Sequence, residues 1–303
     1  MIGHSRALRG AWQRVDPPRR PVLLINPRSG DGKAARANLA DRARERGVEP
    51  IVLGAGDDLG AAISGAVRSG ADALGMAGGD GSLAPVAAAA AEHDLAFVCL
   101  PAGTRNHFAL DVGIARHDLV GALDAFTDGV ERSIDVAEVN GLVFLNNVSL
   151  GIYGDAVHRP AYRDAKLRTL AKTAASVLGP SAAVPELQLV DDVGRGHPHP
   201  AVVLVSNNPY ALSRPLGTGT RPRLDSGRLG IVVLDAPQPG ADPPARAWTA
   251  TRLEVKAAAP VHAGVDGEAV DLPASLEFVI RPGALRVRIS IHHPGVSPSG
   301  WLP

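Results

Sequence analysis

The sequence lacks the features that would place the protein in an oxidising compartment, in a membrane or on nucleic acid. Its single cysteine, Cys99, lies in the apolar run 96–100 and is expected to be a core residue, so the chain needs no oxidising compartment. The formal net charge is zero, which gives no general attraction to nucleic acid. No apolar run approaches the roughly 20 residues of a membrane span. We therefore expect a cytoplasmic protein whose contact with a membrane, if any, is peripheral and at its inner face.

The N-terminus carries several arginines but lacks the apolar segment that a signal peptide requires. We expect residues 1–20 to form a basic mobile arm and 292–303 a C-terminal tail. A chain of 303 residues with 45% hydrophobic content can bury one large core or two ordinary ones. We expect two domains, 21–133 and 134–291.

Strand and helix patterns alternate in the first of these domains. Apolar runs typical of buried parallel strands occupy 22–25, 50–53, 73–76 and 95–100, and helical patterns lie between them at 34–46, 59–69 and 83–92. The spacing is typical of right-handed crossover units and predicts an α/β domain, a doubly wound parallel sheet with helices on both faces. Ligands of such sheets bind beyond the carboxyl ends of the strands, so the loops at these ends are the candidate site.

Three loops rich in glycine and polar groups follow three of these predicted strands. In the second loop, three glycines surround Asp80 just before an alanine-rich helix. Amides at the start of a helix would face an anion, and Asp80 offers a hard oxygen for Mg²⁺. The pattern therefore indicates phosphate binding. The candidate residues are Asn26, Arg28 and Ser29 in the first loop, Gly78, Gly79, Gly81 and Ser82 in the second, and Gly103, Thr104, Asn106 and His107 in the third.

The first loop is not a Walker A loop, because that motif requires glycine where Pro27 stands and serine or threonine where Ala34 stands. It does satisfy a loose Gly-x-Gly-x-x-Ala pattern through Gly30, Gly32 and Ala35, which alone would suggest a dinucleotide fold.

Strand patterns dominate the second domain. Gly, Pro and Asp separate the strand-like stretches 139–148, 201–206, 229–234, 252–257, 275–280 and 286–291. This predicts an all-β domain. One helix is expected at 155–178, and its basic face would either meet anionic lipid or simply be solvated.

The loops also carry a resemblance to a known family. The runs Asn26-Pro27-x-Ser29-Gly30, Gly78-Gly79-Asp80-Gly81-Ser82 and Pro101-x-Gly103-Thr104-x-Asn106-x-Phe108-Ala109 resemble the signature loops of the diacylglycerol kinase catalytic-domain family, which includes bacterial soluble lipid kinases and sphingosine kinases. The likeness continues through 134–136, 146–151 and 217–230 and ends at Asp266-Gly267-Glu268. It implies a nucleotide-binding α/β domain like that of phosphofructokinases and NAD kinases, then a β-sandwich domain, with the active site in the cleft between them.

The resemblance also implies roles for individual residues. Asp80 would lie beside the phosphates of ATP and the Mg²⁺ ion, and Asp266 would accept the proton of the attacking hydroxyl. Glu268 would lie close to the metal or the ribose, and Asp225 in a segment that binds a structural Mg²⁺. Without the resemblance, Asp266-Gly267 would be interpreted as a hairpin turn. The residues that would hold ATP are Asn26, Arg28, Ser29, Gly79, Ser82 and Thr104.

The sequence departs from the family pattern at two positions. His107 stands where the family commonly has aspartate, and Ser226 separates Asp225 from Gly227 where the family has Asp-Gly. An imidazole at position 107 is able to carry positive charge near neutral pH, so we expect His107 to face the phosphates.

The resemblance predicts an ATP-dependent lipid kinase that phosphorylates a hydroxyl of a diacylglycerol-like or other long-chain lipid. The alternatives are an NAD kinase and a catalytically inactive nucleotide-binding module, the second suggested by His107 and Ser226. The expected partners are a lipid substrate and no nucleic acid, with peripheral membrane contact and a homodimer left open. No acceptor pocket can be inferred, because the apolar candidates are equally good core residues. These candidates are Phe108, Leu150, Tyr153 and Val157.

Overall fold

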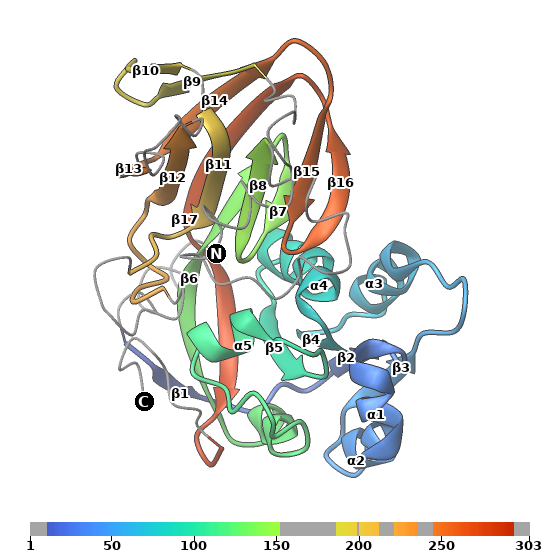
Figure 1. Cartoon of the computed structure of the whole chain (residues 1–303). Coiled ribbons are helices and arrows are strands. Elements are labelled where there is room, and N and C mark those ends of the chain that lie inside the picture. The colour runs from blue at the N-terminus through green and yellow to red at the C-terminus, as the bar shows by residue number, and fades with distance from the viewer. Residues whose placement is uncertain (1–10, 152–185, 199, 212–220, 236–244, 294–303) are drawn as a thin grey trace. The chain divides into compact units, whose positions relative to one another are not determined.

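The computed structural model describes residues 11–151, 186–198, 200–211, 221–235 and 245–293. The helix expected at 155–178 lies outside the described residues. The chain divides into two compact units, one formed by Met1–Asp135 with Pro282–Pro303 and the other by Val136–Arg281. Two strands, β6 (Gly129–Val139) and β17 (Ser275–Ser290), run from one unit into the other (Figure 1).

The first unit contains a parallel sheet with the strand order β3-β2-β4-β5. The strands are β2 (Pro21–Ile25), β3 (Glu49–Val52), β4 (Ala73–Gly78) and β5 (Ala96–Pro101). Every residue of β2, β4 and β5 is buried, which explains why these segments are almost entirely apolar. The predicted parallel α/β sheet is confirmed.

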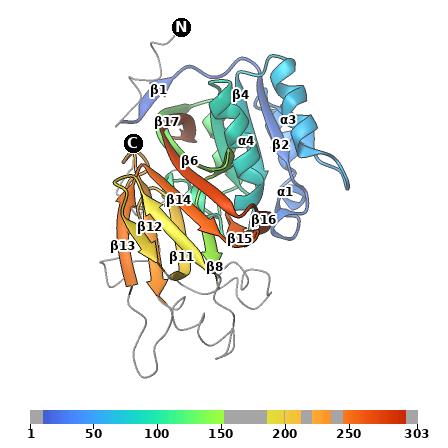
Figure 2. The ribbon, with the colours of Figure 1, turned by 90° about the horizontal axis from the view of Figure 1, so that it is seen from above.

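The two longest helices of the first unit pack against this sheet. Helix α4 (Asp80–Glu92) contacts β4 and β5, and α3 (Leu59–Arg68) contacts β2 and α4 (Figure 2). The Asp58 side chain caps α3 by accepting a hydrogen bond from the Gly60 amide at 2.8 Å. Helix α4 begins at Asp80 and not at 83 as predicted, so Asp80 and Ser82 lie in its first turn.

The prediction of a single helix at 34–46 is wrong. The segment forms two short helices, α1 (Lys33–Arg36) and α2 (Leu39–Arg44). Asn38 interrupts them with a left-handed φ of 51°. Asparagine adopts this conformation more readily than most residues, so a helical hydrophobic pattern does not prevent the break.

Smaller elements complete the first unit. They are η1 (Ser29–Asp31), α5 (His107–Asp111), η2 (Gly121–Phe126) and β1 (Gln13–Val15). Strand β1 lies within the expected mobile arm, yet it pairs antiparallel with β6, with Gln13 opposite Glu131. Among the described residues, no helix is both long enough and apolar enough to span a membrane.

The second unit consists of two antiparallel sheets that share one core. One sheet has the order β13-β12-β11-β8-β15-β16, and the other joins β10, β9, β14 and the first part of β17. The core draws Val148 and Val203 from the first sheet and Leu189 and Phe278 from the second. The predicted all-β domain is confirmed. Its remaining strands are β7 (Leu142–Phe144), β8 (Asn147–Gly151), β9 (Leu187–Asp191), β10 (Gly196–Pro198), β11 (Pro200–Asn207), β12 (Leu229–Asp235), β13 (Ala245–Ala250), β14 (Arg252–Ala257), β15 (Val261–Val265) and β16 (Glu268–Leu272).

Strand β17 is continuous where two strands, 275–280 and 286–291, were predicted. Gly283 has a φ of 64°, and its amide donates to the Asp135 carboxylate at 2.9 Å. This side-chain acceptor satisfies the amide at an irregular position, so Pro-Gly does not end the strand. The end of β17 belongs to the first unit and not to the β domain, because Arg286 pairs in parallel with Ala96 of β5.

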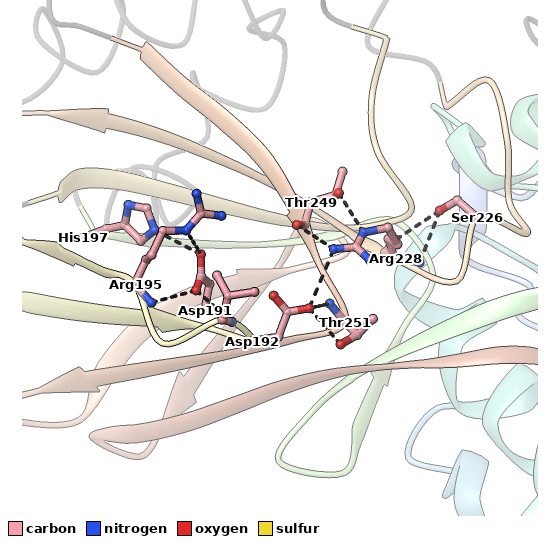
Figure 3. A network of polar contacts seen from close by, with 9 residues as sticks. Asp191, Asp192, Arg195, His197, Ser226, Arg228, Thr249 and Thr251 are labelled. Atoms are coloured by element: carbon pink, nitrogen blue, oxygen red, sulfur yellow. Dashed lines mark hydrogen bonds and ion pairs between the residues drawn. The ribbon is translucent and has the colours of Figure 1, made fainter.

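A polar network in the second unit joins the β9–β10 turn to β13 and to Thr251, which connects β13 to β14 (Figure 3). The Asp191 carboxylate accepts hydrogen bonds from the amides of Val193 at 3.1 Å and Arg195 at 2.9 Å, and from the Arg195 guanidinium at 3.1 Å. Burial raises the pKa of Asp191. The two amides, His197 and the charge of Arg195 oppose this effect and together hold the pKa below its usual range.

Asp192 belongs to the same network. Its carboxylate accepts from the Thr251 amide at 2.7 Å and the Thr251 hydroxyl at 2.9 Å, and lies 3.7 Å from the Arg228 guanidinium (Figure 3). The Thr251 amide is the main cause that lowers the pKa of Asp192. The hydroxyl and Arg228 add to it, against the effects of burial and of Asp191.

We expect the protein to lose stability as the pH falls below about 4, the usual aspartate value in an unfolded chain. A carboxylate whose pKa is lower in the folded state stabilises the fold above the unfolded pKa and loses this effect as the pH falls through the folded pKa. Denaturant unfolding of Asp192→Asn should therefore depend less on pH than that of the wild type between about pH 2 and 6. Thr251→Val keeps the amide donor and should fall between them. Equal pH dependence of Asp192→Asn and wild type would contradict this account.

Candidate functional site

The three glycine-rich loops of the first unit lie at one edge of its sheet. The first loop (26–32) follows β2, the second loop (79–82) follows β4 and the third loop (102–106) follows β5. Because the strands are parallel neighbours in the order β2-β4-β5, their carboxyl ends meet at this edge. The second loop is also the start of α4, where the first amides have no partner within the helix.

Asn26 connects the first loop to the second. Its amide donates to the Ala77 carbonyl of β4 at 2.9 Å, and its side-chain nitrogen lies 3.5 Å from the Ser82 hydroxyl. Its side-chain oxygen accepts from the Arg28 amide at 3.1 Å. Asn26 therefore fixes the turn of the first loop and the distance between the first loop and the second.

The second and third loops approach each other backbone to backbone. The Gly103 amide donates to the Gly78 carbonyl at 3.0 Å. A Cβ atom on Gly103 would lie 2.6 Å from the Gly79 Cα atom, and a Cβ on Gly30 would clash with the Ala102 carbonyl oxygen. These contacts leave no room for side chains, so the glycines serve a close approach of the three loops.

We expect Gly103→Ala to cost about 1–3 kcal/mol of stability, because the added methyl group meets backbone atoms that cannot rotate away. Its nucleotide affinity should fall as the loops separate. Denaturant unfolding and nucleotide titration measure both effects. Gly65→Ala is the matched control, because a Cβ there meets no atom within 4 Å. It should gain up to about 1 kcal/mol from helix propensity. A Gly103→Ala protein as stable as the wild type would show that the loops separate without cost.

Lys33 is a residue of this site that the sequence reasoning missed. It is the first residue of α1, is half-buried, and donates from Nζ to the Gly103 carbonyl at 2.7 Å. It therefore connects the first loop to the third. Its position directly after the glycine-rich run was the available signal.

Asp80 contacts the third loop through its carboxylate. Its two oxygens accept from the amides of His107 and Phe108, each at 3.2 Å. These are the first amides of α5, so Asp80 caps this short helix from a neighbouring loop. The half-buried carboxylate has this structural task in addition to any bond to a metal.

Asn106 and His107 differ in exposure. Asn106 is buried with a φ of 51°, and its side-chain nitrogen donates to the carbonyls of Pro101, Gly103 and Arg116 at 3.2, 3.0 and 3.3 Å. Its side-chain amide thus holds the loop together. The His107 side chain is exposed. Contact of either side chain with phosphate stays a prediction. Of the other loop residues, Arg28 and Thr104 are exposed, Ser29, Gly79, Gly81 and Ser82 are half-buried, and Gly78 and Gly103 are buried.

Asp266 lies in the second unit, in a tight hairpin between β15 and β16. Asp266 and Gly267 both have positive φ, 49° and 89°, and connect the paired residues Val265 and Glu268. Aspartate followed by glycine is the usual sequence of such a two-residue turn. Asp266 is therefore in the hairpin that its sequence alone predicts.

The Asp266 carboxylate is buried and accepts three backbone hydrogen bonds. The amides of Leu145, Asn146 and Asn147 donate to it at 2.8, 2.7 and 3.1 Å. Residues 145–147 form a backbone turn of their own. It interrupts the strand predicted at 139–148 and separates β7 from β8. The three donors fix the direction of the carboxylate.

The other two predicted metal ligands also lie in the second unit. Glu268 is exposed at the start of β16. Asp225 accepts from the Arg223 guanidinium at 3.0 Å, and the neighbouring Ser226 hydroxyl donates to Asn208 at 2.6 Å. In the part of the chain that the structure describes, no three His, Cys, Asp or Glu side chains gather as a metal-binding group.

Two of the apolar candidates for the acceptor site, Phe108 and Leu150, are fully buried core residues. Tyr153 and Val157 lie outside the described residues. The two candidates that the structure describes are therefore part of the core.

Comparisons with known proteins agree on one family. The model of the diacylglycerol kinase catalytic domain matches residues 20–139. A protein of Pseudomonas fluorescens described as "Probable lipid kinase YegS-like" is 30% identical, with 92% of this chain and 97% of that protein covered. The diacylglycerol kinase of Bacillus subtilis is 35% identical over 42% of this chain and 44% of its own length.

A solved structure shares the fold. The crystal structure of a diacylglycerol kinase from Bacillus anthracis aligns with a TM-score of 0.63 and 16% identity, covering 91% of this chain and 98% of that chain. At this identity the likeness concerns the fold alone.

Proposed function

The chain belongs to the family of diacylglycerol and YegS-like lipid kinases, which are phosphotransferases with an alcohol acceptor, and we propose that it transfers the γ-phosphate of ATP to a hydroxyl of a diacylglycerol-like or other long-chain lipid. The observation that carries this proposal is the meeting of the three glycine-rich loops at the carboxyl ends of β2, β4 and β5.

The loop geometry suits a triphosphate. Gly79 and Gly103 bring two backbones together without side chains between them, and the first turn of α4 offers amides at the positive end of a helix dipole. We assign ATP binding to the loop residues named from the sequence, with Lys33 keeping the first and third loops in register. Arg28 and Thr104 are exposed and therefore accessible to a ligand.

Mg²⁺ fits the carboxylates of this chain, because the ion commonly uses one or two carboxylates together with phosphate oxygens and water and needs no cage of protein ligands. Asp80 is the proposed first ligand, with Glu268 and Asp225 as further candidates. When bound, the ion supplies positive charge against the charge that develops on the transferred phosphoryl group.

Asp266 is the proposed proton acceptor. The lipid hydroxyl oxygen forms a bond to the γ-phosphorus while the bond from this phosphorus to the oxygen of the leaving ADP breaks, and the hydroxyl proton passes to the Asp266 carboxylate. Three backbone amides hold this carboxylate in one orientation. In a loose transition state the hydroxyl loses its proton late, so an oriented carboxylate suffices as the acceptor.

Purified protein incubated with labelled ATP tests the proposal against its alternatives. The acceptors are diacylglycerol, a sphingoid base, a glycolipid and an isoprenoid alcohol in detergent micelles, NAD, and no acceptor. We expect Mg²⁺-dependent label in a lipid. Label only in NADP would identify an NAD kinase, and ATP binding without transfer to any acceptor would identify an inactive nucleotide-binding module.

A lipid acceptor requires the protein to reach a membrane surface, so we also propose a cytoplasmic protein with peripheral contact at the inner face. Sedimentation with anionic and neutral vesicles measures this contact. Light scattering of the purified protein decides between a monomer and the homodimer that the sequence leaves open.

A further inference from the structure

The backbone turn that donates hydrogen bonds to Asp266 is also hydrogen-bonded on its carbonyl side. This turn, formed by Leu145, Asn146 and Asn147 and called the 145–147 turn below, presents its three amides to Asp266. Its carbonyl side faces a second ionic side chain, that of Arg221. Arg221 lies in the segment 217–230, which resembles the family, but the sequence assigned this residue no role.

Arg221 is fully buried, and its hydrogen bonds converge on this turn. Its guanidinium donates to the Leu145 carbonyl, to the Asn207 carbonyl at 2.8 Å and to the Asn146 side-chain oxygen at 2.8 Å. The Tyr210 ring lies beside the guanidinium, with 5.9 Å between its centroid and the Cζ atom. A buried guanidinium requires such a set of acceptors, because removing the charge from water without them is costly.

One peptide group lies between the two ionic side chains. The Leu145 carbonyl and the Asn146 amide belong to the same peptide unit. Arg221 donates to its oxygen, and its N–H donates to Asp266 at 2.7 Å. The cation and the anion polarise this unit in the same direction, so each hydrogen bond strengthens the other. The cation and the anion therefore interact through the one peptide group to which both are hydrogen-bonded.

Tyr210 supports the same turn. Its hydroxyl accepts from the Asn147 side chain at 2.9 Å. Asn207 adds a hydrogen bond from its amide to the Asn146 carbonyl at 3.0 Å. The turn is therefore fixed from several directions, and the position of the Asp266 carboxylate follows from it.

We propose that Arg221 is a positioning residue for phosphoryl transfer, which fixes the 145–147 turn and through it the direction of the Asp266 carboxylate. The proposal rests on the function proposed above, because it takes Asp266 as the proton acceptor. The charged and titratable side chains that the described contacts place around the turn are Arg221, Tyr210 and Asp266, with the exposed Glu268 two residues further along.

The test compares two variants of Arg221 with a matched control. Arg221→Met removes the charge and the donors, and Arg221→Lys keeps the charge but loses the forked geometry. Arg288→Met is the control, because Arg288 is also a fully buried arginine but belongs to the first unit, where it donates to Asp16, Ala125 and Glu131. All three are assayed for kcat and KM, for thermal stability, and for hydrogen exchange of the amides of residues 145–147.

We expect Arg221→Met to lower kcat about 10²-fold, as a displaced catalytic group does, with the KM for ATP close to that of the wild type. The amides of residues 145–147 should exchange faster than in the wild type, because the turn loses the hydrogen bonds from Arg221. Arg221→Lys should have an intermediate kcat and intermediate protection of these amides. Arg288→Met should lose stability and keep the wild-type kcat and the protection of these amides.

An Arg221→Met protein that is folded and keeps the wild-type kcat would overturn the proposal. If Arg221→Met does not fold, Arg221→Lys decides: wild-type kcat together with wild-type protection of the three amides would also overturn it. Hydrogen exchange separates this failure from failure of the proposed function. A wild-type protein that phosphorylates no lipid refutes the proposed function, whereas protected amides in Arg221→Met refute the positioning role whatever the activity.

Discussion

Asp80→Asn should abolish phosphate transfer and leave the protein folded. Asparagine keeps the size of the side chain and one oxygen, which can accept from the part-buried Phe108 amide, while the exposed His107 amide can bond to water; in the wild type each amide donates to one Asp80 oxygen at 3.2 Å. It removes the negative charge, and with it the proposed bond to Mg²⁺ and the stabilisation of the transferred phosphoryl group. We measure turnover with labelled ATP, nucleotide affinity and the melting temperature.

The control for this variant is Asp58→Asn. Asp58 also caps a helix of the first unit, accepting from the Gly60 amide at 2.8 Å, but it lies outside the three loops. Asparagine is nearly as good an N-cap as aspartate, so Asp58→Asn should keep both stability and activity. If Asp80→Asn kept its turnover, the charge of Asp80 would have no part in catalysis, and its role would be the cap of α5 alone.

Asp266→Asn should lower kcat by about 10² to 10⁴, the usual contribution of a positioned general base. From the sequence we expect the fold to be unaffected, because Asp266 is placed on a simple turn. The structure changes this expectation. Since both oxygens of Asp266 accept backbone amides, an asparagine must direct its own N–H groups at one of these donors. The variant should therefore also lose about 1–3 kcal/mol of stability.

Asp271→Asn is the control for Asp266→Asn. Asp271 lies on β16 in the same hairpin, and its side chain is 73% exposed, so it should tolerate the change in both assays. Denaturant unfolding measures stability and labelled ATP measures kcat. If Asp266→Asn kept most of its activity, another residue would have to accept the proton, and Asp80 would be the first candidate.

The sequence by itself determined the elements whose signals are local. The strands β2, β4 and β5 were predicted because their apolar runs are short and uninterrupted, and the structure buries each of them completely. The loops were predicted because glycine and small polar residues follow these strands at fixed spacing. The alternation of strand and helix then determined that the three loops meet at one edge, because parallel strands share the direction of their carboxyl ends.

Only the tertiary structure decided where these local signals are overruled. Asn38 breaks a helix that the hydrophobic pattern predicts as continuous. Gly283 continues a strand that Pro-Gly was predicted to end, because Asp135, distant in the sequence, accepts the hydrogen bond of its amide. In both cases the conformation depends on a backbone state or a partner that a window of sequence does not contain.

The same reason explains why the sequence named Asp80 and Asp266 but missed Lys33 and Arg221. The two aspartates stand beside glycines in recognisable motifs, whereas the two basic residues act through carbonyl groups far away in the chain. Lys33 reaches Gly103 across 70 positions, and Arg221 reaches Leu145 across 76. Every residue carries the same backbone carbonyl, so no sequence pattern identifies a particular carbonyl as a hydrogen-bond partner. Only the folded chain brings the donor and the carbonyl together, because each such bond depends on which segments the sheets place side by side.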